Sequence, residues 1–287
     1  MDDISINQMA VLEKDYWFWV GKRYMFEQAY KKYSGMAKSA PGKQDSGRNN
    51  KFRLLDVGCG TGSILLMMRQ ICGKDAEIYG MDVSGEAIRI CHQRAKSART
   101  SFMLKVGNAE KLPYQDDYFD FVIISDTLEH VRNDKKAAQE VRRVLRPGGI
   151  ALVTVPMFMH LWGADDKRLF HFRRYTKKRL NKLFDGFRKL RQTYIQPFFY
   201  FPALLARTME RASGKGESFE QKIKDSLLKR NAKTSARKNS ENPKGNGMML
   251  NGLLKKIHLA ENWLIAKGMN MPIGVATLTV LQKERAD

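Results

Sequence analysis

Short apolar runs alternate with amphipathic segments through the first half of the 287-residue chain. The apolar runs are rich in Val, Ile, Leu and Phe and are bounded by Gly, Asp and Pro, which is typical of buried strands. They lie at residues 53–57, 77–81, 101–106, 119–125 and 150–155. Segments with helical spacing separate them at residues 63–72, 85–98 and 135–145. This alternation predicts an α/β fold, a parallel sheet with helices on both faces.

The N-terminal part precedes this alternation. Residues 1–35 are expected to be helical, and they carry an aromatic cluster at 16–19. This cluster either forms a lid over a ligand or anchors the N-terminal helix to the sheet. Residues 36–51 are rich in Gly, Ser, Lys and Asn, a composition that predicts a flexible linker.

The second half of the chain is less regular. We expect a helix over residues 176–186 and strands over 189–195 and 274–282. Residues 213–256 combine Lys, Asn, Ser and Gly with few acidic residues, which indicates an exposed insertion, partly helical and partly disordered. The α/β domain is therefore expected to comprise residues 52–200 and 272–287, with the insertion at 201–271.

The chain is strongly basic, with a net charge of +21. This charge favours an anionic partner, either nucleic acid, a membrane surface or a phosphorylated substrate. The three scattered cysteines indicate neither a disulfide framework nor a zinc knuckle. No signal peptide and no apolar run of about 20 residues is apparent. We therefore expect a cytoplasmic protein, peripheral to the inner face of the membrane if it contacts lipid.

The first strand runs into a glycine-rich loop, DVGCGTG, in which Gly58, Gly60 and Gly62 follow Asp56 at every second position. Glycine permits positive φ and a close approach to a ligand, and a helix begins directly after the loop. The spacing differs from the dinucleotide fingerprint, whose last two glycines are three positions apart. About twenty residues further on, Asp82 ends the second strand, where a carboxylate can bind ribose hydroxyls. Together these features predict a site for an adenosine-containing cofactor.

Five motifs between residues 53 and 156 together resemble the class I S-adenosylmethionine-dependent methyltransferases, in particular the large group with LEHV after the fourth strand. The motifs are LLDVGCGTG, the acid Asp82, GNAEKLP, DTLEHV and RRVLRPGG. The resemblance implies a Rossmann-like seven-stranded sheet with an antiparallel last strand, and S-adenosylmethionine as methyl donor. It assigns Asp56 and the loop glycines to the methionine part of the donor and Asp82 to its ribose. Asn108, where the family often has Asp, and the backbone of Ala109 would meet the adenine.

Two further segments resemble a subgroup of these enzymes that we associate with cell-envelope, polyketide or lipid neighbourhoods. The first is YWFWVGKR, which contains Trp17, and the second is HFRRYT, residues 171–176. Asp165 stands where the subgroup has an additional His. These segments contain four candidate acceptor-binding residues: Trp17, Arg173, Arg174 and Tyr175.

The adjacent arginines of HFRRYT have two interpretations. Beside His171 they suit bidentate binding of an acceptor phosphate or carboxylate. Alternatively, they form the solvated start of a helix that Thr176 caps. The aromatic stretch at 194–206 likewise suits an interfacial segment, the wall of an apolar pocket or ordinary core packing.

Methyl transfer from a sulfonium mainly requires alignment of the nucleophile with the methyl group, and a general base only where the acceptor arrives protonated. Three residues near the strand ends are candidates: His171, His130 and Asp126. A structural role competes for two of them, because His130 could pack beneath the cofactor and Asp126 could cap a helix. No metal is expected.

Three functions remain open. The favoured one is a methyltransferase that acts on a small-molecule or lipid-linked acceptor at a membrane surface. The alternative is an RNA methyltransferase, which the charge supports, although neither an N-P-P-Y motif nor a Pro-Cys nucleophile follows the fourth strand. The third is a non-catalytic S-adenosylmethionine-binding protein, which the intact glycine loop and Asp82 disfavour.

Overall fold

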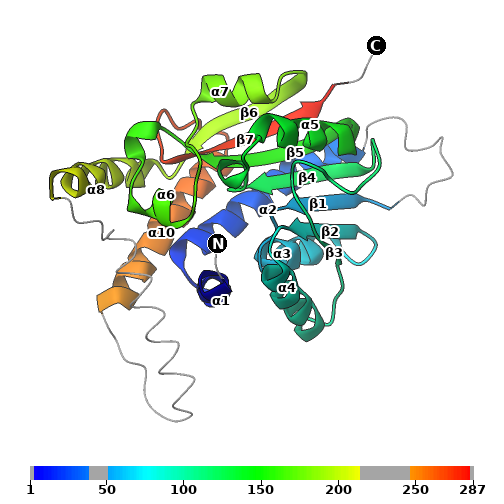
Figure 1. Ribbon diagram of the computed structural model, residues 1–287, viewed down its shortest axis with the longest axis horizontal. Helices are drawn as coiled ribbons and strands as arrows, with labels where there is room; N and C mark the ends of the chain where they lie inside the picture. The colour runs from blue at the N-terminus through cyan, green and yellow to red at the C-terminus, as the bar shows by residue number, and fades with distance from the viewer. Residues whose placement is uncertain (1–2, 39–50, 214–245, 285–287) are drawn as a thin grey trace, which may run out of the picture.

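The computed structural model describes residues 3–38, 51–213 and 246–284. A seven-stranded sheet with the order β3-β2-β1-β4-β5-β7-β6 crosses the molecule (Figure 1). Its strands are β1 (Arg53–Val57), β2 (Glu77–Asp82), β3 (Met103–Val106), β4 (Phe119–Ser125), β5 (Leu145–Pro156), β6 (Phe187–Ile195) and β7 (Ala276–Lys283). The first five pair in parallel, and β7 runs antiparallel between β5 and β6. The expected fold class, with an antiparallel last strand, is confirmed.

Helices cover both faces of the sheet. They are α1 (Asp3–Leu12), α2 (Trp17–Lys38), α3 (Ser63–Cys72), α4 (Gly85–Ser97), α5 (Asp134–Val144), α6 (Ala164–Arg168), α7 (Lys177–Leu183), α8 (Tyr200–Ser213) and α10 (Asn246–Ala266), with 3₁₀ turns η1 (Leu128–His130), η2 (Met159–Leu161) and η3 (Pro197–Phe199). Every residue of β4 is buried. Phe121 and Ile123 pack with α2 and α3 on one face, and Val122 and Ile124 pack with α5 on the other. This strand lies at the centre of the sheet, between β1 and β5.

Most predicted boundaries agree with the structure to within two residues. The largest difference is β5, which begins at Leu145 rather than at residue 150. Leu145 pairs with Phe119, and an irregularity in the register follows before Ile150 pairs with Phe121. The strand therefore starts just before RPGG and runs through it, although by composition alone this segment indicates a turn.

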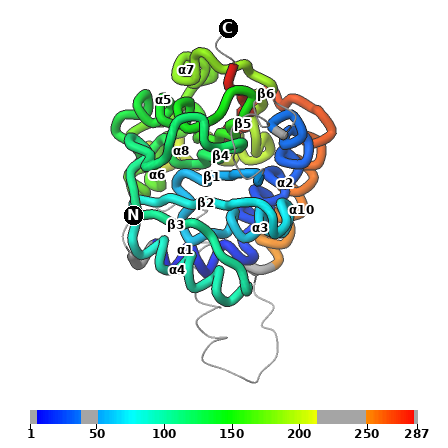
Figure 2. Tube along the Cα trace, turned by 90° about the vertical axis from the view of Figure 1, so that its right-hand side faces the viewer, coloured from blue at the N-terminus to red at the C-terminus, as the bar shows by residue number. Residues whose placement is uncertain are grey.

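The N-terminal helix and the C-terminal part of the expected insertion pack together. Helix α10 lies along α2, as two perpendicular views show (Figures 1 and 2). Asn262 donates a hydrogen bond to the carbonyl of Gly21 at 3.0 Å, and a Cβ at Gly21 would overlap the His258 ring. Residues 246–256 are therefore part of a packed helix, which corrects the expectation of an exposed insertion there. Residues 36–38 of the expected linker belong to α2, which corrects the start of that linker. Residues 39–50 and 214–245 lie outside the described residues.

The strand order places a crevice at the carboxyl edge of the sheet. From β1 the chain continues to β2 and β3 on one side and then crosses to β4 and β5 on the other. Ligands of open α/β sheets bind where the order reverses in this way. Across the described ranges, no helix is long and apolar enough to cross a membrane.

Candidate active site

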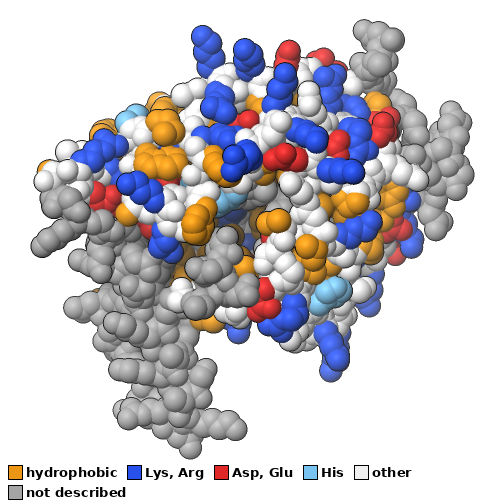
Figure 3. All heavy atoms as spheres, in the orientation of Figure 1, with side chains coloured by type: hydrophobic (Ala, Val, Ile, Leu, Met, Phe, Trp, Pro, Cys, Tyr) orange, Lys and Arg blue, Asp and Glu red, His pale blue; other side chains and the backbone are white. Residues whose placement is uncertain are grey.

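A cavity of about 1640 Å³ lies at this edge of the sheet. The glycine loop and the ends of β2 and β4 form one side, and residues of α1, α2, α6, α8 and α10 form the others. The space-filling view shows a hollow on this face among hydrophobic and basic side chains (Figure 3). Pockets for one drug-sized ligand measure about 300–1,000 Å³, so this cavity has room for a methyl donor and an acceptor together.

The glycine loop requires glycine at each of its three positions. Gly58, Gly60 and Gly62 have φ of 79°, 53° and 85°, a region that other residues rarely adopt. Gly58 and Gly60 line the cavity. A Cβ at Gly62 would instead overlap the sulfur of Cys91 in α4, and Gly62 does not line the cavity. Its role is therefore close packing of α3 on α4.

The carboxylate of Asp82 joins the end of β2 to this loop. It accepts hydrogen bonds from the backbone amides of Gly60 and Ser84, each at 2.9 Å. Asp82 lines the cavity, as do Asn108 and Ala109 after β3. The structure thus brings together the residues expected to bind ribose and adenine.

Asp56 lies beneath the loop rather than in the cavity wall. It is 1% exposed, and neither carboxylate oxygen has a hydrogen-bond partner among the described residues. Burial, with the charges of Asp82 and Glu13 and against that of Lys22, raises the pKa of Asp56 to about 7. An orphaned carboxylate below a left-handed glycine loop suits a cationic ligand, so the site fits S-adenosylmethionine.

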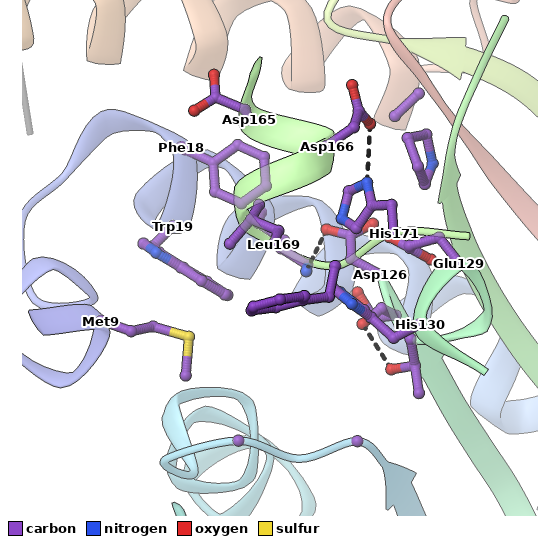
Figure 4. A pocket seen from close by; sticks show the side chains of 18 of the residues that line it. Met9, Phe18, Trp19, Asp126, Glu129, His130, Asp165, Asp166, Leu169 and His171 are labelled. Atoms are coloured by element: carbon purple, nitrogen blue, oxygen red, sulfur yellow. Dashed lines mark hydrogen bonds and ion pairs between the residues drawn. The ribbon is translucent and has the colours of Figure 1, made fainter. Parts of the chain in front are cut away.

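The N-terminal helices close over the loop. Glu13 is buried after α1, accepts a hydrogen bond from Thr61 at 2.5 Å and pairs with Arg94 of α4. Arg94 also donates to the carbonyl of Ala10 at 2.5 Å. Met9 of α1 reaches into the cavity above the glycine loop (Figure 4). The aromatic cluster at 16–19 also lines the cavity, and Tyr16 and Trp17 are buried. Its role as lid or anchor stays a prediction.

Asp126, at the end of β4, is held in an ion pair. Its φ is 46°, Lys22 of α2 contacts it at 2.7 Å, and Thr154 donates to it at 2.9 Å. Burial opposes ionisation, but the Lys22 ammonium and these hydrogen bonds outweigh it and hold the pKa of Asp126 below its usual range. A carboxylate stabilised in this way is a weak base, so its geometry favours positioning Lys22 over accepting a proton.

His171 and His130 meet beside the end of β4 (Figure 4). Their ring centroids are 4.6 Å apart at 78°. Nδ1 of His171 lies 2.8 Å from Asp166, which also binds Arg174 at 2.8 Å. Burial raises the pKa of Asp166, but the hydrogen bonds from His171 and Arg174 outweigh burial and lower this pKa to about 2. The carboxylate is therefore ionised and accepts a hydrogen bond from Nδ1 of His171. Nε2 of His171 is left to accept a proton or a ligand.

Burial and the neighbouring His171 lower the pKa of His130 to about 4, so this ring is neutral near pH 7. Glu129 beside it is buried, and burial followed by the charge of Asp126 raises its pKa. Both side chains line the cavity with His171.

The other predicted acceptor residues do not converge. Trp17 and Arg174 line the cavity, whereas Arg173 and Tyr175 do not. Arg173 binds Asp134 at 3.0 Å, and the buried Tyr175 hydroxyl donates to the same carboxylate at 3.0 Å. Thr176 caps α7, as expected in the structural interpretation of HFRRYT. The two arginines thus bind different carboxylates and form no joint clamp.

Sequence reasoning missed three buried polar residues at this site: Lys22, Glu129 and Asp166. Two of them lie within motifs described above, Lys22 in YWFWVGKR and Glu129 in DTLEHV. Asp166 follows Asp165, the residue that stands where the related subgroup has His. The stretch at 194–206 contributes Phe198, Phe199 and other residues to the cavity wall.

Comparisons with known proteins indicate a methyltransferase. A family described as a methyltransferase domain matches residues 55–153. The chain is 31% identical to a demethylmenaquinone methyltransferase of Shouchella clausii over 167 residues, 52% of this chain and 68% of the relative. A Bacillus subtilis protein of the same name is 30% identical over 171 residues, 56% of this chain and 73% of the relative.

Solved structures support the fold. A putative sarcosine dimethylglycine methyltransferase from Galdieria sulphuraria superposes with a TM-score of 0.56 at 16% identity, over 92% of this chain and 86% of that one. The MccD protein gives a TM-score of 0.52 at 16% identity, over 90% and 96% of the two chains.

Proposed function

This chain belongs to the class I S-adenosylmethionine-dependent methyltransferases, and we propose that its acceptor is an apolar, lipid-linked small molecule with an acidic hydroxyl group. The observation that carries the proposal is the cavity, which joins the cofactor loop to a wall of aromatic and aliphatic side chains and to His171. The relatives named for demethylmenaquinone support a quinol-type acceptor.

The wall opposite the glycine loop is built from segments far apart in the chain. Phe18 and Trp19 come from α2, Phe198 and Phe199 from η3, and further apolar residues, Leu250, Leu254 and Ile257, from α10. Apolar walls with a few converging polar groups are typical of sites for apolar small molecules. A nucleic-acid site presents its cations to phosphates. Of the cations that line this cavity, Lys22, Arg174 and Arg207 each pair with a carboxylate of the protein.

The polar groups that converge at the end of β4 supply the chemistry. Nε2 of His171 takes the proton of the acceptor hydroxyl, and Asp166 stabilises the imidazolium that forms. The oxygen of the deprotonated acceptor, or a carbon conjugated to it, would then take the methyl group. Where a carbon takes it, that carbon loses its hydrogen as a proton and the ring regains its aromatic form. S-adenosylmethionine supplies this methyl as a sulfonium substituent, and the electron pair of the broken carbon–sulfur bond remains on sulfur.

The cavity opens toward an apolar surface. Phe198, which lines the cavity, is 63% exposed, and Phe201 and Leu205 are equally exposed on one face of α8. Residues four apart lie on the same side of a helix, so the last two form a stripe. Exposed apolar groups on a chain of net charge +21 suit contact with an anionic bilayer, from which a lipid-linked acceptor would enter.

A transfer assay with methyl-labelled S-adenosylmethionine tests the proposal. A short-chain naphthoquinol in anionic vesicles and total RNA are offered separately. We expect label in the organic extract of the first reaction. Label in RNA, or in neither reaction, would refute the proposal. The Asp82→Ala variant, which lacks the expected ribose ligand, is the control for cofactor dependence.

His171→Asn tests the proposed base. We expect kcat to fall about 10²- to 10⁴-fold, with cofactor affinity unchanged, because the ring acts on the acceptor. Unchanged kcat would remove His171 from the chemistry.

Vesicle flotation tests the proposed surface. We expect the Phe201→Ser/Leu205→Ser double variant to bind anionic vesicles less than the parent protein. Val106→Ser removes an exposed side chain from edge strand β3 and should have no effect. Equal flotation of all three proteins would exclude α8 as the contact.

A further inference from the structure

Three potential metal ligands meet inside the cavity. One carboxylate oxygen of Glu129 and one ring nitrogen each of His130 and His171 all lie within 4.8 Å of one another. We propose that these residues bind a divalent first-row transition-metal cation such as Zn²⁺. Two histidines with one carboxylate form a common ligand set for such ions, and an open position remains for water or substrate.

The first supporting observation is that one of the two histidine rings, that of His171, is oriented from behind. Nδ1 of His171 is held by Asp166 at 2.8 Å, and Arg174 binds the same carboxylate oxygen, also at 2.8 Å. Metal-bound histidines almost always use their second ring nitrogen in this way, because the bond sets the tautomer and the ring plane.

The second observation is an orphaned ligand atom. Glu129 is 1% exposed, and its Oε2 has no hydrogen-bond partner among the described residues. A buried polar atom without a partner is costly and calls for a ligand, an ion or a water. Glu129 and the two rings face one another in the close-up view (Figure 4).

The geometry requires only a small contraction. Metal–nitrogen and metal–oxygen bonds are about 2.0–2.2 Å long, so two ligands of one cation lie at most about 4.2 Å apart. A movement of about 1 Å toward a common centre therefore completes the triad. Glu129 and His130 are neighbours in η1, and His171 lies on the segment between α6 and α7, so the cation would tie this segment to the end of β4.

The remaining coordination positions would face the cavity, which all three residues line. A cation there would bind the acceptor oxygen and lower the pKa of its hydroxyl. With the metal bound, Nε2 of His171 would be a ligand, so the hydroxyl proton would pass to solvent and not to His171. This catalytic role rests on the proposed function, whereas the binding site itself does not.

Metal binding is measured without cofactor or acceptor, so its result is independent of the methyl-transfer assay. Chelator-treated full-length protein is titrated with Zn²⁺ by calorimetry and with Co²⁺ by absorption spectroscopy. We expect one ion per chain and a Co²⁺ spectrum without thiolate charge-transfer bands, which separates this site from the three cysteines.

Four variants locate the site. Glu129→Gln, His130→Asn and His171→Asn should each weaken binding at least about 100-fold, and Asp166→Asn about 10- to 100-fold through the ring that it orients. His92→Asn, at an exposed position on α4, is the matched control and should bind as the parent does. Circular dichroism and thermal melting establish that each variant is folded.

Saturable one-to-one binding that the three ligand variants weaken, and the control does not, supports the proposal. The absence of saturable binding by the parent, or equal binding by the folded ligand variants, overturns it. If one ligand variant does not fold, the other two decide.

Discussion

Asp56→Asn should stabilise the cofactor-free protein at alkaline pH. The carboxylate is 1% exposed with no hydrogen-bond partner among the described residues, and mainly through this burial its pKa rises from an ordinary 3.8 to about 7. At about 1.36 kcal/mol per pH unit, the ionised side chain costs the folded state about 4 kcal/mol. An amide of the same shape carries no charge and avoids most of this cost.

The direction in which stability changes with pH follows from whether the folded or the unfolded chain holds the Asp56 proton. Below pH 3.8 both folded and unfolded chains hold it, and between pH 3.8 and about 7 only the folded chain does. The stability contributed by protonated Asp56 is therefore lost as the pH rises through about 7. We expect the variant to match the parent near pH 4 and to exceed it by up to about 4 kcal/mol at pH 8.

Urea unfolding at pH 4 and pH 8, without cofactor, measures this difference. Asp75→Asn changes an exposed carboxylate and should show no comparable pH dependence. A free-energy difference between Asp56→Asn and the parent that is the same at both pH values would refute the reasoning. Calorimetry adds a second measurement, because a cationic cofactor favours ionised Asp56. The parent should therefore release a proton on binding S-adenosylmethionine near pH 6, and the variant should not.

Two further substitutions probe the loop and the ion pair. Gly58→Ala introduces a side chain at φ 79° and should cost at least about 2 kcal/mol in urea unfolding, whereas Gly35→Ala, in open space on α2, should be neutral or stabilising. Lys22→Met leaves the Asp126 carboxylate without its cation and should lower stability by about 1–3 kcal/mol, a loss that shrinks at acid pH. Lys31→Met removes only an exposed pair and should change stability by less than about 0.5 kcal/mol; equal losses for both lysine variants would contradict the buried pair.

Much of the fold could be predicted from local patterns. The strand at 119–125 is nearly all apolar because it is buried on both faces, and its bounds in the structure are those that the pattern predicts. The loop at Asp56–Gly62 could be predicted equally well, because only glycine adopts its three left-handed conformations without strain. The packing of helix α10 could not be predicted. Its polar side chains Asn251, His258 and Asn262 are buried against α2, and in sequence a buried polar face resembles an exposed one.

The sequence by itself determined the sheet, the cofactor loop and the family. These depend on periodicity, backbone conformation and short motifs, all encoded within a few residues of one another. Only the tertiary structure decided which polar groups meet. It paired Lys22 with Asp126, 104 residues further along the chain, and brought His171 to Glu129 and His130. Those contacts join segments that are distant in the chain, and packing of the whole domain sets their distances.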